Sequence, residues 1–242
     1  MLNTVPESRR NLAAFAALFD HTLLKPDATP AQVRQLCQEA RELGCKAVCV
    51  NPCYIPLASR ELRDSAVMPI AVVGFPLGCN RTDVKIDEAL RAIADGAREL
   101  DMVINSGYYL GGETAACRHD IASVVRIAGK VPVKVIIETA LLNPTQIREI
   151  SLWCAEAGAS MVKTSTGFGA RGASLGDIQA IRAGLARHPD VGVKASGGIR
   201  SLASAVEFAA AGVDRIGSSA TVQILSDFRK LLAETAPKKS LV

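Results

Sequence analysis

The strongest constraint on the fold of this 242-residue chain is a regular alternation of short apolar runs with amphipathic segments along almost its whole length. Such runs, rich in Val, Ile and Met, are typical of buried strands. They lie at residues 21–24, 47–51, 70–74, 102–105, 133–138, 161–165, 192–196 and 215–218. Helical patterns follow at residues 30–43, 55–63, 83–100, 114–128, 144–157, 175–185, 202–210 and 222–234. Eight strand–helix units predict an α/β protein with a (β/α)8 TIM-barrel fold.

The residues at the segment boundaries agree with this prediction. Thr29 and Asn143 each precede a proline, which combines an N-cap residue with a proline at the first helical position. Gly44, Gly158 and Gly212 follow predicted helices, where a left-handed glycine commonly ends a helix.

The alternative fold is a doubly wound sheet. That fold would usually show a glycine-rich turn after its first strand, whereas residues 23–26 are Leu-Leu-Lys-Pro. There is no linker or low-complexity segment. We therefore predict one domain over residues 1–236 and a short, flexible polar tail at residues 237–242.

A short helix is predicted ahead of the first strand. Leu12, Phe15 and Phe19 fall on one stripe of an amphipathic helix that could close the bottom of the barrel. No apolar run has the length needed to span a bilayer. We expect a soluble, cytoplasmic protein that does not insert into membranes.

Composition argues against two classes of partner. The formal net charge is +4, Lys and Arg are scattered, and aromatic residues make up only 4% of the chain, so we expect no nucleic acid. The seven cysteines form no apparent disulfide framework, as in reduced cytosolic proteins. Cys45, Cys49 and Cys53 lack the spacing of a zinc site and are predicted to be buried thiols. We expect no metal ion.

Two predicted strands carry a lysine in an otherwise apolar run and then open into a loop of small and hydroxyl residues. Lys163 lies in Met-Val-Lys-Thr-Ser-Thr-Gly, and Lys194 lies in Val-Lys-Ala-Ser-Gly-Gly. Two lysines on neighbouring strands would each disfavour the charging of the other, and burial acts in the same direction. One of them is therefore predicted to be a partly neutral amine that forms a Schiff base with a carbonyl compound.

The alternative is that these lysines have no chemical role. Lysines near strand ends often extend past the mouth of a barrel or pair with a carboxylate on a helix. We favour the catalytic interpretation, because the two lysines occupy matched positions and both precede the same kind of loop.

Asp101 is the candidate partner of the two lysines. It shares strand parity with Val103 and Asn105, so the three side chains face the same way. If that way is inward, Asp101 is a carboxylate inside the barrel that could carry protons. A buried salt bridge that only fixes geometry explains the spacing equally well.

Two glycine-containing loops follow the last two predicted strands, at residues 196–200 and 217–219. Barrels bind phosphate at this place, because glycine lets backbone N–H groups approach an anion and a helix N-terminus presents free donors. Tight turns without a ligand are the alternative, and we favour phosphate.

These motifs together resemble those of the deoxyribose-phosphate aldolases, class I aldolases with a TIM-barrel fold. The resemblance extends from about residue 19 to residue 225. It is carried by Asp-His-Thr-Leu-Leu at 20–24, Val-Gly-Phe-Pro-Leu-Gly at 73–78, Glu-Leu-Asp-Met-Val at 99–103, Lys-Val-Ile-Ile-Glu-Thr at 134–139, Val-Lys-Thr-Ser-Thr-Gly at 162–167, Val-Lys-Ala-Ser-Gly-Gly-Ile-Arg at 193–200 and Arg-Ile-Gly-Ser-Ser at 215–219.

The resemblance implies reversible cleavage of 2-deoxy-D-ribose 5-phosphate into acetaldehyde and D-glyceraldehyde 3-phosphate, without a metal or other cofactor. It implies that Lys163 forms the Schiff base, that Lys194 keeps Lys163 nucleophilic, and that Asp101 moves protons, through water. The residues implied to contact or support the substrate are Asp20, Cys49, Lys134, Thr166, Gly167, Gly198, Gly217, Ser218 and Ser219. Of these, Cys49 is implied to be near the substrate without being required for the chemistry.

Barrels of this kind are often dimers or tetramers, so we expect a homo-oligomer. Phe168 departs from the pattern, because some family members carry a lysine there, and one cationic contact to the phosphate is then missing. Two alternatives stay open. One is an aldolase for another phosphosugar or a transaldolase-like enzyme, and the other is a barrel that binds a sugar phosphate without turnover.

Overall fold

The structure, a computed structural model, describes residues 2–235, and the predicted tail at residues 237–242 lies outside the described residues. Eight parallel strands within residues 2–235 close into a barrel in chain order. They are β1 (Phe19–Leu23), β2 (Ala47–Val50), β3 (Met68–Val73), β4 (Glu99–Val103), β5 (Val133–Ile136), β6 (Met161–Lys163), β7 (Gly192–Ser196) and β8 (Arg215–Ser218). Because β1 pairs with both β2 and β8, the sheet has no open edge.

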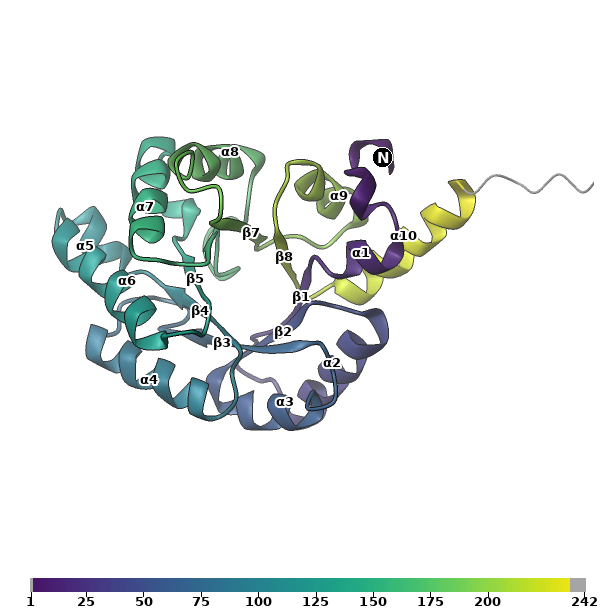
Figure 1. The fold of residues 1–242 in the computed structure, drawn as a ribbon, viewed down its shortest axis with the longest axis horizontal. Coiled ribbons are helices and arrows are strands. Elements are labelled where there is room, and N and C mark those ends of the chain that lie inside the picture. The colour runs from purple at the N-terminus through teal and green to yellow at the C-terminus, as the bar shows by residue number, and fades with distance from the viewer. Residues whose placement is uncertain (1, 236–242) are drawn as a thin grey trace, which may run out of the picture.

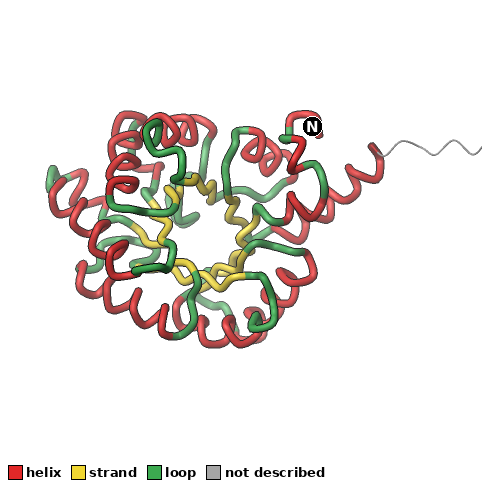
Figure 2. Tube along the Cα trace, in the orientation of Figure 1, coloured by secondary structure: helices red, strands yellow, loops and turns green. Residues whose placement is uncertain are grey.

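Helices surround this closed ring of strands (Figures 1 and 2). They are α1 (Leu12–Ala16), α2 (Pro30–Leu43), α3 (Ile55–Glu61), α4 (Thr82–Ala94), α5 (Ser106–Leu110), α6 (Thr114–Ala128), α7 (Pro144–Glu156), α8 (Leu175–Gly184), α9 (Leu202–Ala210) and α10 (Thr221–Thr235). Short 3-10 turns are η1 (Leu2–Thr4), η2 (Glu7–Arg9), η3 (Pro52–Tyr54) and η4 (Thr139–Leu141). The predicted (β/α)8 TIM barrel with a short N-terminal helix is confirmed.

The predicted helix starts are confirmed at the atomic level. The Thr29 hydroxyl accepts the backbone N–H of Gln32 at 3.3 Å, and the Gln32 side chain accepts the backbone N–H of Thr29 at 2.8 Å. The Asn143 side chain accepts two backbone N–H groups at 3.0 Å. Each cap satisfies donors that a helix N-terminus otherwise leaves free.

Some predicted boundaries are wrong. The helix predicted at 83–100 ends at Ala94, and β4 begins at Glu99 rather than at residue 102. The error arises because Glu99 and Asp101 are charged residues that face into the barrel, where a strand pattern is expected to be apolar. The short helix α5 was not predicted, since five residues are too few to show a period.

The N-terminal helix is shorter than predicted. It ends at Ala16, and Phe19 belongs to β1. The rings of Phe15 and Phe19 still pack edge to face with their centroids 5.5 Å apart, and Phe15 stacks on Phe228 of α10 at 4.1 Å. Figure 1 shows α1 lying beside α10.

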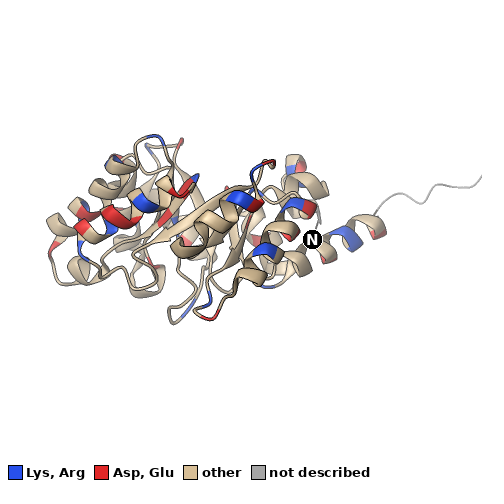
Figure 3. Cartoon of the chain, turned by 90° about the horizontal axis from the view of Figure 1, so that it is seen from below, with Lys and Arg blue, Asp and Glu red and all other residues tan. Residues whose placement is uncertain are grey.

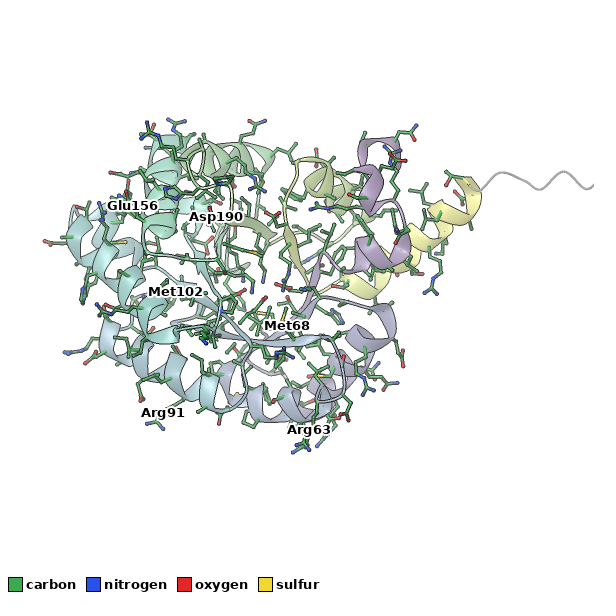
Figure 4. All side chains as sticks on the ribbon, in the orientation of Figure 1. Arg63, Met68, Arg91, Met102, Glu156 and Asp190 are labelled. Carbon is green, nitrogen blue, oxygen red and sulfur yellow. The ribbon has the colours of Figure 1, made fainter. Side chains whose placement is uncertain are left out.

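The apolar core has two parts. The larger part lies between the outward face of the strands and the helices, and includes Leu100 and Met102 of β4. A smaller cluster, which includes Cys49, Ile70 and Val72, lies inside the barrel on the side of β1 to β3. In Figure 4 Arg63 and Arg91 lie at the edge of the molecule, whereas Met102 lies nearer to the strands.

The surface carries both signs of charge. Figure 3 shows Lys and Arg interspersed with Asp and Glu over the helices. Cys45 and Cys49 are buried as predicted, but Cys53 is exposed because it lies in the surface turn η3. None of the helices within residues 2–235 combines the length and apolar character needed to cross a bilayer.

Candidate active site

The two lysines singled out in the sequence lie side by side inside the barrel. Lys163 is the last residue of β6 and is opposite Lys194 in the register of β6 and β7. Their ammonium nitrogens contact the same Oδ2 atom of Asp101 in β4, at 2.8 Å and 2.7 Å. Asp101 thus faces into the barrel, which the sequence had left open, and the structure brings together the three residues predicted to be catalytic.

A second layer of charges lies beneath these three residues. Asp101 Oδ1 accepts a bond from Lys134 Nζ at 3.0 Å, and Asp20 Oδ2 lies 2.5 Å from Lys194 Nζ. Arg215 joins Asp20 to Glu99, with its Nε 2.7 Å from Asp20 Oδ1 and its Nη2 2.9 Å from Glu99 Oε2. Lys134 also contacts Glu99. The result is one connected ion cluster with no member more than 6% exposed.

The charge count of the ion cluster favours one neutral lysine. Its cations are Lys134, Lys163, Lys194 and Arg215, and its carboxylates are Asp20, Glu99 and Asp101. With every group charged the cluster has a formal charge of +1, and the loss of one lysine proton makes it neutral. Because an uncompensated charge is costly in a buried site, this composition favours loss of a proton.

The environment of each lysine indicates which one loses the proton. Burial lowers the pKa of Lys163 below its ordinary value, and Lys194 lowers it further, although Asp101 acts in the opposite direction. For Lys194, burial also disfavours the charged form, but Asp101 and Asp20 together raise its pKa above the ordinary value. Of the two amines, Lys163 is therefore the one that loses its proton more readily, and Lys194 is the one that keeps its charge. Burial lowers the pKa of Lys163 more than the neighbouring cation Lys194 does, and the added contact with Asp20 distinguishes Lys194 from Lys163.

Asp101 and Asp20 stay ionised. Burial alone would raise the pKa of Asp101, but Lys134, Lys163 and Lys194 hold it well below its usual range. The pKa of Asp20 falls to about 2, because Lys194 and Arg215 outweigh its burial. By contrast, burial and the charge of Asp101 raise the pKa of the Cys49 thiol to about 11. Cys49 is therefore a thiol, and a weak nucleophile, at neutral pH.

A cavity of about 210 Å³ opens above Lys163. It is formed by the ends of β1, β6, β7 and β8 and the loops that follow them, and its lining residues are Thr22, Leu23, Leu24, Lys25, Lys163, Thr166, Gly167, Phe168, Ser196, Gly197, Gly198, Ile199, Arg200, Gly217, Ser218 and Ser219. Lys163 is the one member of the ion cluster among these lining residues of the described chain. Asp20, Cys49, Lys134, Lys194 and Asp101 lie beneath or beside it.

The predicted phosphate loops line one end of this cavity. Gly167 and Gly198 have φ values of +89° and +75°, which residues with a side chain rarely adopt. At Gly217 the reason for glycine is steric, because a Cβ atom there would lie only 3.2 Å from Lys194 Cε. Ser218 donates its hydroxyl to the Ile199 carbonyl at 2.7 Å, which ties the loop after β7 to the end of β8.

Aromatic rings meet over the mouth of the barrel. Phe168, in the loop after β6, packs edge to face against Phe75, in the loop after β3, with the ring centroids 5.3 Å apart. Phe168 is 54% exposed and lines the cavity next to Gly167. Phe168 therefore presents an apolar ring, and no cation, to this part of the cavity.

Several residues of the site were not assigned a role from the sequence. Glu99 shares strand parity with Asp101, a signal that was available, and Arg215 is an arginine at the start of an apolar strand. Lys25 and Arg200, both exposed, line the cavity from the loops after β1 and β7. Arg200 ends the loop at residues 196–200 that the sequence assigns to phosphate, whereas no pattern in the sequence distinguishes Lys25 from other surface cations.

The chain is similar in sequence to known aldolases. A sequence model described as DeoC/LacD family aldolase matches residues 14–226. Deoxyribose-phosphate aldolase 1 from Bacillus licheniformis is 47% identical over 211 residues, which cover 87% of this chain and 94% of that protein. Deoxyribose-phosphate aldolase from Caldanaerobacter subterraneus subsp. tengcongensis is 42% identical over 227 residues, with coverages of 93% and 97%.

A solved structure agrees with the sequence matches. The tetrameric deoxyribose phosphate aldolase from Aeropyrum pernix superposes with a TM-score of 0.86 at 35% identity, over 95% of this chain and 97% of the other. The similarity thus covers the whole barrel and every strand that contributes to the ion cluster.

Proposed function

Because this chain belongs to the DeoC/LacD family of aldolases, we propose that Lys163 is the amine through which it forms a Schiff base. The chain is a lyase that cleaves 2-deoxy-D-ribose 5-phosphate reversibly into acetaldehyde and D-glyceraldehyde 3-phosphate. The observation that supports the role of Lys163 best is its place in the site. It is a buried lysine with a lowered pKa that lines the cavity and contacts Asp101.

The reaction starts at the nitrogen of Lys163. The neutral amine attacks the aldehyde carbon of the substrate, and loss of water gives an iminium ion. Removal of the proton from the C3 hydroxyl then breaks the C2–C3 bond, C3 becomes the aldehyde of glyceraldehyde 3-phosphate, and the electron pair moves into the iminium to give an enamine. Protonation at C2 and hydrolysis release acetaldehyde and restore Lys163.

Asp101 and Lys194 support this sequence from below the cavity. Asp101 contacts Lys163 at 2.8 Å, and its ionised carboxylate stabilises the iminium cation and exchanges protons with it through water. Lys194 stays protonated and lowers the pKa of Lys163. Asp20 and Lys134 are fully buried and keep these two residues in place.

The glycine loops receive the phosphate end of the substrate. Gly167, Gly198, Gly217 and Ser219 line the cavity, where backbone N–H groups can approach an anion. The hydroxyls of Thr166 and Ser218 already donate to Glu138 and to the Ile199 carbonyl, so these two residues shape the loops. Cys49 lies 4.0 Å from Asp101 and fills the barrel interior.

The test of this function is reductive trapping. Acetaldehyde plus borohydride should add one ethyl group to the wild-type chain, and peptide mapping should place it on Lys163. Release of acetaldehyde from 2-deoxyribose 5-phosphate should be measured on the same preparation. A protein that binds the sugar phosphate and yields neither adduct nor acetaldehyde would be a binding protein and not an aldolase.

Replacement of Phe168 by lysine should favour the phosphorylated substrate. A cation at this exposed position is worth about 0.2–1 kcal/mol, so kcat/KM for 2-deoxyribose 5-phosphate should rise about 1.4- to 5-fold. The gain should fade as salt is added, because salt screens exposed charges. Phe168→Leu, which also removes the ring contact with Phe75, is the uncharged control. An equal gain for 2-deoxyribose and its phosphate would contradict the electrostatic explanation.

Three further features belong to the proposal. We propose that the protein is a homo-oligomer, since one relative of known structure is tetrameric, and that it is cytoplasmic. The small phosphosugar and the aldehydes are its ligands. Residues 1–236 form one catalytic domain, which is supported by strand pairing that closes into a single barrel.

A further inference from the structure

Glu138, just beyond β5, has a backbone conformation that residues with a side chain rarely adopt. Its φ is +49° and its ψ is +70°, and within residues 2–235 it is the only residue other than glycine with a positive φ. A left-handed backbone brings Cβ close to the next carbonyl and is therefore strained. A strained backbone conformation persists only where the surrounding contacts enforce it, and such residues are found most often near functional sites.

The carboxylate of Glu138 is fastened to the loop after β6. Its Oε2 accepts both the backbone N–H of Thr166, at 3.2 Å, and the hydroxyl of Thr166, at 2.5 Å. The Thr166 hydroxyl in turn accepts the backbone N–H of Phe168 at 3.1 Å. Glu138 is only 7% exposed, so these bonds are shielded from water. One carboxylate thereby fixes the turn that contains Gly167.

The other carboxylate oxygen of Glu138, Oε1, is closely covered by the loop after β6. Oε1 is buried and has no hydrogen-bond partner among the residues that the structure describes. A Cβ atom at position 169 would lie 3.1 Å from it, so only glycine fits there without displacement. Glu138 does not line the cavity, and it acts on a ligand only through the loop.

The far end of the same loop is tied to the neighbour of Glu138. Arg171 donates to the Thr139 carbonyl at 2.9 Å and pairs with Asp177 at 2.5 Å. The Thr139 hydroxyl donates to Asp177 at 2.9 Å. Residues 138 and 139 thus hold both ends of the segment 166–171.

The position of this segment sets the distance between the two glycine loops of the cavity. A Cβ atom at Gly172 would lie 1.9 Å from the Gly197 carbonyl oxygen, so the two backbones touch. The Ala173 N–H bonds to the Ser196 carbonyl at 3.2 Å. A shift of the loop after β6 would therefore move the lining of the cavity at Gly167 relative to that at Gly197 and Gly198.

We propose that Glu138 is a positioning residue that holds the loop after β6 in the shape that accepts the phosphate of the substrate. This role rests on the proposed function, which identifies the substrate as 2-deoxyribose 5-phosphate. The contribution of Glu138 is to accept hydrogen bonds, not to move protons. Glutamine, whose amide oxygen can accept the same two bonds from Thr166, should therefore replace it.

The test compares kcat/KM for 2-deoxyribose 5-phosphate with kcat/KM for 2-deoxyribose. Glu138→Ala and Glu138→Gly should lower the ratio of the two values about tenfold, the scale of losing hydrogen bonds to a charged group. Glu138→Gln should keep the ratio within about threefold, because it retains the acceptor. Glu138→Gly should also be more heat-stable than Glu138→Ala, since glycine tolerates a positive φ.

The control is Glu39→Ala. Glu39 contacts the buried His21 ring at 2.8 Å from α2, away from the cavity, so its loss should lower stability without changing the ratio. An unchanged ratio in both Glu138→Ala and Glu138→Gly would overturn the proposal. The proposal would also be overturned if Glu138→Gln lowered the ratio as much as Glu138→Ala does. The negative charge of Glu138, and not its hydrogen-bond acceptor, would then be what matters.

A binding measurement separates this proposal from the aldolase function. In a Lys163→Leu background no Schiff base forms, and adding Glu138→Gly should weaken the affinity for 2-deoxyribose 5-phosphate about tenfold. Unchanged affinity would overturn the role of Glu138 even if the wild type forms the ethyl adduct. Absence of that adduct would instead overturn the aldolase function.

Discussion

The Lys163→Leu variant should lose turnover of 2-deoxyribose 5-phosphate by on the order of 10⁴-fold or more, the scale seen when a covalent nucleophile is removed. The variant has no amine at the floor of the cavity, and no other lysine of the ion cluster lines that cavity in the described residues. Acetaldehyde and borohydride should no longer add an ethyl group at this site. The measurements are the rate of acetaldehyde release and the mass of the trapped protein.

Two controls separate chemistry from folding in that experiment. Lys163→Leu removes one cation from a cluster of formal charge +1, so the remaining buried charges balance and the barrel should stay folded. Lys163→Arg keeps the charge beside Asp101 but supplies no neutral amine, because arginine stays protonated in proteins. It should be equally inactive. A variant that is folded and still forms an adduct on another lysine would show that Lys163 is not the nucleophile.

The barrel could be predicted from the sequence because its signals are local. Helix caps such as Thr29 and Asn143 follow from residue type at one or two positions, and both are formed as predicted. The predicted start of a strand was wrong where functional residues interrupt the apolar pattern of that strand. Charged residues inside β4 hid the start of that strand, since Glu99 and Asp101 replace the apolar residues that a strand buried on both faces usually carries.

The positions of the proposed catalytic residues were predictable only in part. A lysine in mid-strand is visible in one sequence, but strand parity gives only that Asp101 faces the same way as Val103 and Asn105, and the structure shows that this way is inward. The role of Glu138 could not be predicted from the sequence, because its left-handed backbone and its hydrogen bonds to Thr166 depend on how the loop after β6 folds back. Long-range contacts of that kind leave no period in the chain.

The second layer of the ion cluster revises the explanation of nucleophilicity. The sequence suggested that the crowding of two cations, together with burial, would make one amine neutral. In the structure Asp101 contacts both lysines, and its effect on the pKa of Lys163 opposes and exceeds that of Lys194. Burial is the larger cause of the lowered pKa, and the carboxylates of Asp20 and Asp101 instead secure the charge on Lys194.

Replacing Lys194 by leucine should move the pH dependence of Schiff-base formation to higher pH. Only the neutral amine of Lys163 attacks, so the rate rises with pH through the pKa of Lys163, and Lys194 lowers that pKa. Without Lys194, three cations face three carboxylates, and the cluster is neutral with Lys163 charged. Each unit by which the pKa of Lys163 rises should lower the neutral fraction, and the rate well below the pKa, about tenfold.

Asp101→Asn is the matched test, because it should shift the pH profile of Schiff-base formation in the opposite direction. Asp101 raises the pKa of Lys163, so its removal should shift the same pH profile to lower pH, even where loss of its proton transfer slows turnover. The measurement is the rate of reductive trapping with acetaldehyde against pH, and the midpoint of this profile reports on the charge of the amine. Removing one partner of a buried pair costs about 3–5 kcal/mol, so the unfolding free energy of both variants must be measured alongside. If both folded variants kept the wild-type profile, the ion cluster would not control the charge of Lys163.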